Sequence, residues 1–400
     1  MNTRPEIELL LLLARRRMDA ARAERARELL RGPVEWDWLL AMSLRHGVMP
    51  LVYRQLGALS DGVPAERLSL FRGKYQLNAV RNTERAARLC RLLRTLEGGG
   101  VAALPYKGPA LALDAYGDLT LRQFGDLDIL IRPGDLRRAT ELLRAEGYEP
   151  EFELSGAREA AFKRWWYAQP FRLGAEGVYI ELHWAVAPHF FSFELDEALW
   201  TRLRTIELSG CELKALSVPD TLLLLCVHGV KDLWAKLEWV SALAEFSARL
   251  DEREWRATLE PARASGAERM LLLGLLLARE MYDAELPAFV AARVESARAL
   301  KPLARQVVAE LFAEEKSFHS FTGRTRFHLR ARERAGDRAR YCARAALATS
   351  PEEWDLFALP PSLFFLYSLV RPLRLAKNFL RDAKVSAPTA RRPGASRDGT

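Results

Sequence analysis

The sequence predicts an α+β fold in which a small mixed sheet is flanked by N-terminal and C-terminal helical regions. Apolar residues recur at helical spacing from residue 5 to about 97 and again after residue 218, which indicates amphipathic helices. Between these regions, short apolar runs alternate with glycine turns, and this pattern is typical of strands. The 400 residues, of which 49% are hydrophobic, are enough to bury a large core in more than one lobe.

These patterns divide the chain into consecutive parts. We predict an N-terminal helical region over 1–100, a mixed region over 101–217, a C-terminal helical region over 218–382 and a tail over 383–400. The tail is rich in Pro, Gly, Ser and Arg. Because such a composition cannot bury enough apolar surface to fold, we expect the tail to be disordered.

The N-terminal region is expected to end in one long helix. An amphipathic pattern runs from Pro64 to Leu96 and stops at Gly98-Gly99-Gly100, so this helix delivers the chain into the first strand. His46 stands directly before Gly47. We interpret it as a residue that closes an earlier helix, where the helix dipole favours it, rather than as a ligand.

The mixed region supplies the strands. We expect strands at Val101–Tyr106 and Asp126–Arg132, helices at Pro109–Tyr116 and Gly134–Glu146, and a short strand after Gly147-Tyr148. Further along, Phe171–Leu173 is expected to pair with Val178–Trp184, and Thr205–Leu208 is expected to form a hairpin with Glu212–Leu216. Glycine-containing turns separate the paired strands. The preceding aromatics Trp165, Trp166 and Tyr167 either stack a base or sugar or pack in the core.

The C-terminal region returns to helices. His228 and Lys231 stand three residues apart and share one helical face, where they either bind an anionic substrate group or include a half-buried structural histidine. Residues 317–340 are rich in Arg and His, and we interpret them as a solvated helix or loop rather than a polyanion site. Leu363–Leu380 is expected to form a last amphipathic helix, which packs on the body or touches a membrane surface.

Composition narrows the class of protein. The net charge of +8 arises from 60 basic and 52 acidic side chains, many of them mixed along helices, and it leaves nucleic-acid binding open without favouring it. Four scattered cysteines form no C-x-x-C pair, which argues against a zinc site and for a reducing cytoplasm. No apolar run is long enough for a transmembrane helix and no export signal stands out, so we expect a cytoplasmic protein.

Two carboxylates mark the start of an apolar strand in Gly125-Asp126-Leu127-Asp128-Ile129. Side chains alternate along a strand, so Asp126 and Asp128 point to the same face. Like charges this close repel each other unless a cation lies between them. Mg²⁺ (or Mn²⁺) is the expected cation, because it favours carboxylate oxygens and shares them with substrate phosphates.

A phosphate-binding turn precedes these carboxylates. Lys107 closes the first strand, Gly108 permits close approach of the backbone, and Pro109 suits the first turn of a helix. The free amides at that helix start form an anion site, and Arg122 in the following loop adds a bidentate guanidinium. A metal-bridged triphosphate is the ligand that fits both the turn and the carboxylates.

At these residues the sequence resembles a family of largely uncharacterised bacterial nucleotidyltransferase-like proteins within the DNA polymerase β superfamily. The resemblance rests on K-G-x-A-L-x-x-x-x-Y from Lys107 and R-x-x-x-D-L-D-I-L from Arg122, and it extends over much of the chain to about Trp239. It implies a polymerase β-type nucleotidyltransferase core in which Asp126, Asp128 and a third carboxylate hold two metal ions.

The third acid implied by the resemblance is Glu181, within Val178–Trp184. Alternation along this strand places Glu181 and His183 on one face. Glu181 is then the expected general base for the acceptor hydroxyl, with His183 as the second candidate. The usual Gly-Ser turn of the superfamily is replaced here by Lys107-Gly108. This departure bears on how the phosphates are bound and on which nucleotide is the donor.

The resemblance therefore implies an enzyme that moves a nucleoside monophosphate from a nucleoside triphosphate to an acceptor by two-metal catalysis. The expected acceptor is a small molecule or a biosynthetic intermediate. One alternative is a toxin-like enzyme that modifies RNA or protein, with the basic C-terminal region as its docking surface. The other is a non-catalytic nucleotide-binding scaffold, and the intact Asp126, Asp128 and Glu181 argue against it.

Overall fold

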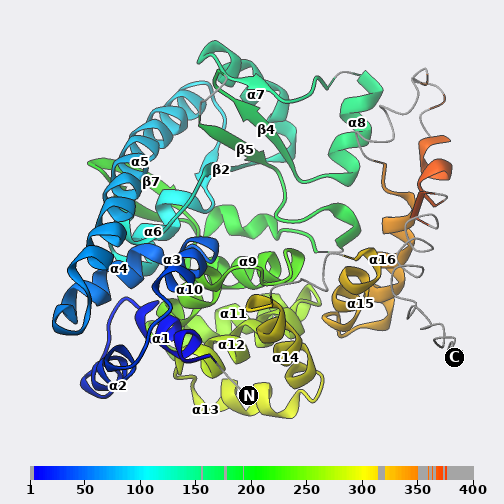
Figure 1. The fold of residues 1–400 in the computed structure, drawn as a ribbon. Helices are drawn as coiled ribbons and strands as arrows, with labels where there is room; N and C mark the ends of the chain where they lie inside the picture. Colours follow the sequence, from blue (N-terminus) through cyan, green and yellow to red (C-terminus); the bar gives the residue numbers. More distant parts are fainter. Residues whose placement is uncertain are drawn as a thin grey trace, which may run out of the picture.

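The computed structural model describes residues 4–154, 156–174, 178–191, 193–313 and 320–349, together with positions 359, 363, 366–372 and 374–375. Within these residues the chain is an α+β protein. A five-stranded mixed sheet lies in the upper half of Figure 1, and helices from both ends of the chain flank it. The predicted fold class is confirmed, whereas the tail predicted over 383–400 lies outside the described residues.

The N-terminal region is helical, as its apolar periodicity predicts. Its described α-helices are α1 (Pro5–Leu13), α2 (Ala20–Arg31), α3 (Trp36–Arg45), α4 (Met49–Ala58) and α5 (Ala65–Gly98). The long helix predicted over Pro64–Leu96 is α5, and His46 is the C-cap of α3. The side-chain amide of Asn82 on α5 donates to the carbonyls of Leu119 and Arg122. These bonds fix the loop that leads into the second strand.

The sheet has the strand order β1-β2-β5-β4-β3. Its strands are β1 (Ala103–Pro105), β2 (Asp126–Ile131), β3 (Glu149–Pro150), β4 (Ala168–Arg172) and β5 (Tyr179–His183). β2 and β5 are parallel, and the other neighbours pair antiparallel. Leu127, Ile129 and Leu182 are buried in one apolar cluster with side chains of α5 and of α7 (Leu136–Ala145), so this face of β2 and β5 belongs to the core.

Short helices and a hairpin complete the mixed region. Among them are α6 (Gly108–Tyr116), α8 (Gly156–Trp165) and the hairpin of β6 (Arg204–Leu208) and β7 (Cys211–Ala215). Ser209 and Gly210 have φ values of 51° and 75°, which a two-residue type I′ turn requires. The predicted hairpin is therefore confirmed.

Several strand boundaries differ from the predicted ones, and two of these differences are instructive. The first strand ends at Pro105 rather than Tyr106, although the Tyr106 amide still donates to the Asp128 carbonyl. β4 begins at Ala168 rather than Phe171. Pro170 lacks an N–H for the sheet ladder and made this segment look unlike a strand, yet its carbonyl accepts a hydrogen bond from the Glu151 amide.

Helices make up the described C-terminal region. They are α9 (Val218–Lys231), α10 (Leu237–Ser247), α11 (Glu252–Ala264), α12 (Glu268–Tyr282), α13 (Ala288–Ser296), α14 (Leu300–Leu311), α15 (Phe321–Arg330) and α16 (Ala335–Leu347). Every residue of α12 from Met270 to Ala278 is buried, as the apolar run there predicts. This helix packs against α9 and α10, so it forms the centre of the helical core.

The interpretation of the Arg-rich segment as solvated is wrong for Arg332, which is 1% exposed. Its guanidinium donates to the carbonyls of His328 and Phe191. The same group lies 4.3 Å from the ring centroids of both Phe191 and Tyr341. Carbonyl oxygens and aromatic faces replace its water, a combination that a run of charges in a sequence does not indicate.

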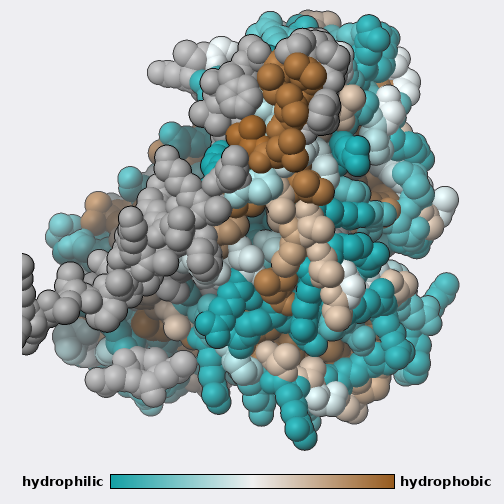
Figure 2. Space-filling model, turned by 90° about the vertical axis from the view of Figure 1, so that its right-hand side faces the viewer, coloured by the Kyte–Doolittle hydropathy of each residue, from teal (hydrophilic) through white to brown (hydrophobic). Residues whose placement is uncertain are grey.

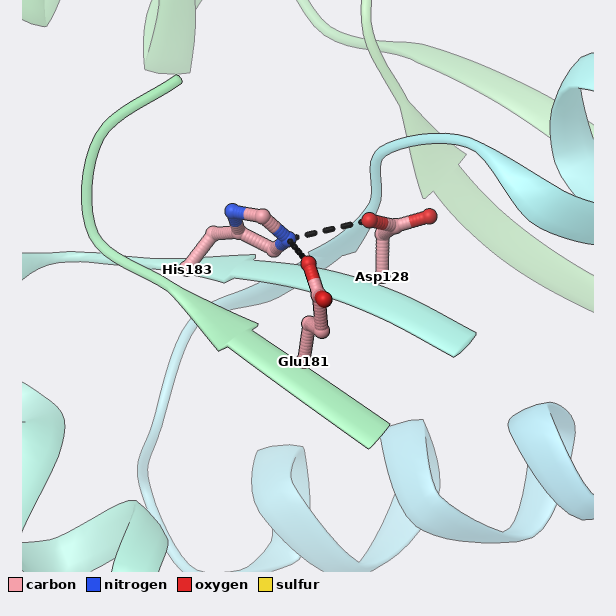
Figure 3. Close-up of side chains that lie close together, drawn as sticks. All are labelled: Asp128, Glu181 and His183. Atoms are coloured by element: carbon pink, nitrogen blue, oxygen red, sulfur yellow. Dashed lines mark hydrogen bonds and ion pairs between the residues drawn. The ribbon is translucent and has the colours of Figure 1, made fainter. Parts of the chain in front are cut away.

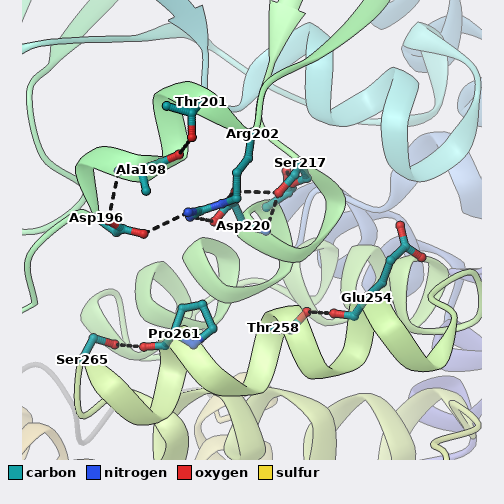
Figure 4. Close-up of polar contacts among 11 residues, drawn as sticks. Asp196, Ala198, Thr201, Arg202, Ser217, Asp220, Glu254, Thr258, Pro261 and Ser265 are labelled. Carbon is teal, nitrogen blue, oxygen red and sulfur yellow. Dashed lines mark hydrogen bonds and ion pairs between the residues drawn. The ribbon is translucent and has the colours of Figure 1, made fainter.

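Ion pairs anchor the start of α9 to the mixed region (Figure 4). Arg202 pairs with Asp196 and with Asp220 in the first turn of α9. Ser217, the N-cap residue, accepts a hydrogen bond from the Asp220 amide. Caps of this kind typically contribute about 1 kcal/mol. α9 is therefore held at its first turn by both a cap and a charged network.

The side of the molecule that carries α8, α15 and α16 is mainly hydrophilic, with one band of apolar side chains near its top (Figure 2). Among the described residues of the C-terminal region, the large exposed apolar side chains are Leu347, Leu363 and Leu369. Of the last helix predicted over Leu363–Leu380, the structure describes residues 363, 366–372 and 374–375, and the backbone is α-helical over 367–372 and 374–375. Within the part of the chain that the structure describes, no helix has both the length and the apolar character of a membrane span.

Candidate active site

The parallel pairing of β2 and β5 brings the predicted acids together. Asp128 lies opposite Glu181, and Leu130 lies opposite His183. Because side chains two residues apart on a strand share a face, Asp128, Glu181 and His183 converge on the same side of the sheet (Figure 3). The structure thus places these three side chains as strand alternation predicts, and their chemical roles stay predictions.

His183 bridges the two carboxylates. Its Nε2 atom lies 2.9 Å from Asp128 Oδ1 and 3.2 Å from Glu181 Oε2. One possible ligand atom from each of the three residues lies within 4.8 Å of the others. Ligands of Mg²⁺ stand about 2.0–2.1 Å from the ion, so atoms this close can share one ion, and carboxylate oxygens suit Mg²⁺ or Mn²⁺. The residues therefore fit a divalent cation.

Burial and pairing set the charge of this cluster. Burial acts to raise the pKa of Asp128, but the charge of Lys107 and the hydrogen bond from His183 outweigh it and hold the pKa below its usual range. The His183 hydrogen bond also lowers the pKa of Glu181. Burial disfavours the imidazolium, yet its bonds to Asp128 and Glu181 raise the pKa of His183. Both carboxylates are therefore ionised at neutral pH, which is the form that binds a cation.

Asp126 stands beside this cluster and not within it. The convergent ligand atoms found among the described residues come from Asp128, Glu181 and His183, whereas Asp126 is partly buried two residues earlier on β2. Burial and the charge of Asp128 raise the pKa of Asp126. The two aspartates are thus near enough to repel each other, as their spacing predicts, and the metal-binding role of Asp126 stays a prediction.

Lys107 reaches the carboxylates from the predicted turn. Its Nζ atom lies 2.8 Å from Asp128 Oδ1. Gly108 has a φ of +55°, which favours glycine, and Pro109 follows in the first turn of α6. A Cβ atom at Gly108 would lie 3.5 Å from the Asp126 carbonyl oxygen. The turn and the strand that carries the carboxylates are therefore in direct contact.

Arg122 makes a buried ion pair. Its Nη2 atom lies 2.7 Å from Glu238 Oε1 on α10, and its Nη1 atom donates to the Gly108 carbonyl at 3.4 Å. Glu238 in turn lies against Gly47, where a Cβ atom would be 2.9 Å from its Oε2. Arg122 therefore connects α10 to the turn through the backbone of Gly108. The phosphate-binding role predicted for its side chain stays a prediction.

Substituting Arg122 with alanine should lower the free energy of unfolding by about 3–5 kcal/mol, because it leaves the Glu238 carboxylate buried without its cation. Arg67 is a matched control, since it pairs with Asp37 at 2.6 Å on the surface, and R67A should change stability by no more than about 1 kcal/mol. Urea unfolding followed by tryptophan fluorescence measures both. Equal, small losses for the two variants would contradict the structural role of the Arg122 pair.

The end of α9 lies next to the cluster. Lys231 Nζ donates to the Tyr167 hydroxyl at 3.1 Å and lies 3.1 Å from Asp232 Oδ2. His228 Nδ1 lies 3.2 Å from the same carboxylate oxygen, and the Tyr167 ring is 5.7 Å from the His183 ring. Burial lowers the pKa of His228 well below its usual value, so His228 is neutral at pH 7. Lys231 thus reaches the cluster through Tyr167, which lies against His183, and His228 is joined to Lys231 through Asp232. The substrate-binding role predicted for the two residues stays a prediction.

The neighbouring tryptophans pack in the core. Trp166 stacks on Phe162 with ring centroids 5.9 Å apart, and its Nε1 atom donates to the Thr349 carbonyl. Trp165 is 9% exposed. For both, the packing alternative agrees with the structure. Tyr167 differs, because its ring lies against His183.

Sequence reasoning missed Tyr106 and Asp232. The Tyr106 ring lies 5.5 Å from that of His183, and among the described residues its buried hydroxyl has no hydrogen-bond partner. Burial raises the pKa of Tyr106, so the hydroxyl remains a donor. In the sequence, the position of Tyr106 next to Lys107 could have marked it as a site residue, but an aromatic at the end of an apolar strand usually indicates core packing. Asp232 follows Lys231 in the sequence and had no motif to mark it.

Comparison with known proteins identifies a family. A family model described as an uncharacterised nucleotidyltransferase matches residues 32–283. This range includes β2, β5 and α9, and so every residue of the site described above. No curated protein and no solved structure matches the chain.

Proposed function

The chain belongs to the uncharacterised nucleotidyltransferase family, and we propose that it transfers a nucleoside monophosphate from a nucleoside triphosphate to a small-molecule acceptor. The observation that carries the proposal is the convergence of Asp128, Glu181 and His183 beside the Lys107-Gly108 turn. It places ligands for a cation next to groups that donate hydrogen bonds to phosphate. A metal-bridged triphosphate needs both.

In this proposal the acids of β2 and β5 hold Mg²⁺ or Mn²⁺. Asp126 and Asp128 would bind the ion on the triphosphate, and Asp128 and Glu181 would bind the ion near the acceptor. Such ions, when bound, polarise the reacting phosphate and lower the pKa of a hydroxyl nucleophile. Asp128 belongs to both sets, which agrees with its central position between Lys107 and His183.

Side chains of the site supply the general base and the charge stabilisation that the reaction needs. The Glu181 side chain is 37% exposed, compared with 1% for His183 and 3% for Asp128. Of the two carboxylates in the cluster, Glu181 is therefore the one that an incoming acceptor can reach, and it takes the proton from the acceptor hydroxyl as general base. Lys107 and the amides at the start of α6 stabilise the charge that develops on the leaving pyrophosphate.

Lys231, Tyr167 and the neutral His228 form the acceptor side. Lys231 supplies a positive charge next to the Tyr167 hydroxyl, a combination that suits an acceptor with an anionic group as well as a hydroxyl. The side chains of Lys107 and Lys231 are only 11% and 12% exposed. Cations this enclosed favour a small acceptor over the surface of an RNA or a protein.

Label transfer tests the proposed activity. The purified protein is incubated with each nucleoside triphosphate, labelled at the α- or at the γ-phosphate, with Mg²⁺ or Mn²⁺ and a fractionated cell extract. We expect α-label to appear in a small-molecule product, and γ-label to appear in the released pyrophosphate and not in that product. Label in RNA or protein would contradict the acceptor class, and the absence of Mg²⁺- or Mn²⁺-dependent labelling in every fraction would contradict the transferase activity.

A further inference from the structure

One positively charged side chain near the acids of the site, that of Arg85, has a buried donor without a hydrogen-bond partner among the described residues. Arg85 lies on α5 and is half-buried. Its Nε atom is buried, and within the part of the chain that the structure describes it has no hydrogen-bond partner. Burial and the positive charge of Arg81 lower the pKa of Arg85, whereas the negative charge of Asp126 acts to raise it. A guanidinium remains charged under such conditions, so Arg85 adds a positive charge at the edge of the site that carries Asp126.

The face of α5 that carries Arg85 is fixed against the site. Asn78 donates to the carbonyls of Thr120 and Arg122, and Asn82 donates to those of Leu119 and Arg122. Arg85 follows Asn82 by three residues, which places both on one side of the helix. The helix therefore presents Arg85 next to the loop that ends at Asp126, and the two asparagines hold it there.

The other cations near the acids are already engaged. The Arg122 guanidinium is held by Glu238, and the Lys107 ammonium lies against Asp128. An arginine has five N–H donors in a planar fork that matches two phosphate oxygens. Among the described residues of this site, Arg85 is thus the guanidinium whose donors are left for a ligand.

The position of Arg85 indicates whether it would contact the donor nucleotide or the acceptor. The acceptor side lies at the end of α9, where Tyr167 contacts His183. Arg85 follows Asn82, which binds the loop before Asp126, and its charge acts on the carboxylate of Asp126, whose backbone adjoins the Gly108 turn. A ligand anion at Arg85 is therefore part of the donor nucleotide and not of the acceptor.

We propose that Arg85 forms an anion subsite for the terminal phosphates of the nucleoside triphosphate, at the Asp126 edge of the site. This inference rests on the proposed function, because it takes the donor to be a triphosphate. It assigns to Arg85 the bidentate phosphate contact that sequence analysis gave to Arg122. The guanidinium neutralises charge on the pyrophosphate that leaves.

Competition binding with matched arginine variants tests the subsite. R85Q removes the charge, and R91Q is the control because Arg91 is exposed on the same helix. A fluorescent nucleoside triphosphate is bound in the presence of Mg²⁺ and displaced by nucleoside triphosphate, nucleoside monophosphate or inorganic tripolyphosphate. For R85Q we expect about tenfold or greater weakening for the triphosphate and tripolyphosphate, as loss of a charge-assisted contact predicts, and little change for the monophosphate.

The outcomes separate this inference from the proposed function. If R85Q binds the triphosphate as tightly as R91Q does, or loses the monophosphate equally, the subsite is wrong and the proposed function stands. If the unsubstituted protein binds no triphosphate, the proposed function itself fails. Should R85Q not fold, R85K keeps the charge but loses the fork, and it should weaken tripolyphosphate more than the monophosphate. Affinities of R85K equal to those of the unsubstituted protein would overturn the inference.

Discussion

Replacing Asp128 with asparagine should abolish Mg²⁺-dependent binding of the nucleoside triphosphate and the transfer of its nucleotidyl group. Asp128 is 3% exposed and contacts both Lys107 and His183. An amide in its place supplies no charge for a cation, and in the proposed site it would remove a ligand from both metal positions. No other single substitution in the site should abolish both the Mg²⁺-dependent binding and the transfer.

Calorimetric titration of the triphosphate, with and without Mg²⁺, measures this loss. Circular dichroism must first show that D128N is folded, because Lys107 loses a buried partner. E181Q provides a second variant, since the Glu181 side chain is 37% exposed and its loss should abolish transfer with less effect on stability. E207Q, on the exposed face of β6, is the control. Binding heats for D128N that match those of E207Q would refute the metal assignment.

Replacing Lys107 with alanine should weaken the triphosphate far more than the monophosphate. The ammonium lies at the start of α6, 2.8 Å from Asp128, where it can reach the phosphates that lie beyond the α-phosphate. We expect a loss of about tenfold or more for the triphosphate, in the range of a charge-assisted contact. The transfer rate should fall further, because the same charge stabilises the leaving pyrophosphate.

Affinities of K107A for nucleoside mono-, di- and triphosphates, measured in one buffer at one salt concentration, test this assignment. K236M is a suitable control, because Lys236 is an exposed cation close to α9 in the sequence. The loss should grow with the number of phosphates. Equal losses for all three nucleotides would indicate that Lys107 acts on the fold through Asp128 and would contradict its phosphate role.

The sequence predicted the strands and the turn that position the site because their signals are local. A D-x-D pair at the start of an apolar strand fixes which side chains share a face, and Lys107-Gly108-Pro109 specifies the start of a helix. The convergence of Asp128 with Glu181 additionally needs parallel pairing in the register that aligns them. Alternation alone does not provide that register, and the family resemblance supplied it.

Partners that come from distant elements could not be predicted. Arg122 pairs with Glu238, 116 residues away, and no local pattern connects the two. The burial of Arg332 depends on Phe191 and Tyr341, which meet only after the C-terminal helices pack. Arg85 lies in a charge-rich stretch that usually indicates a solvated helix face. In each case tertiary packing decides what an arginine contacts, whereas the sequence shows only that a charge is present.

A crystal structure with Mn²⁺ and a non-hydrolysable nucleoside triphosphate tests the central claim most directly. The anomalous signal of manganese locates the ion without reference to the protein atoms. We expect a manganese peak about 2.0–2.3 Å from carboxylate oxygens of Asp126 and Asp128, with phosphate oxygens completing the shell beside the Lys107 turn, and a second peak between Asp128 and Glu181. A triphosphate bound elsewhere, or manganese peaks away from all three carboxylates, would contradict the account.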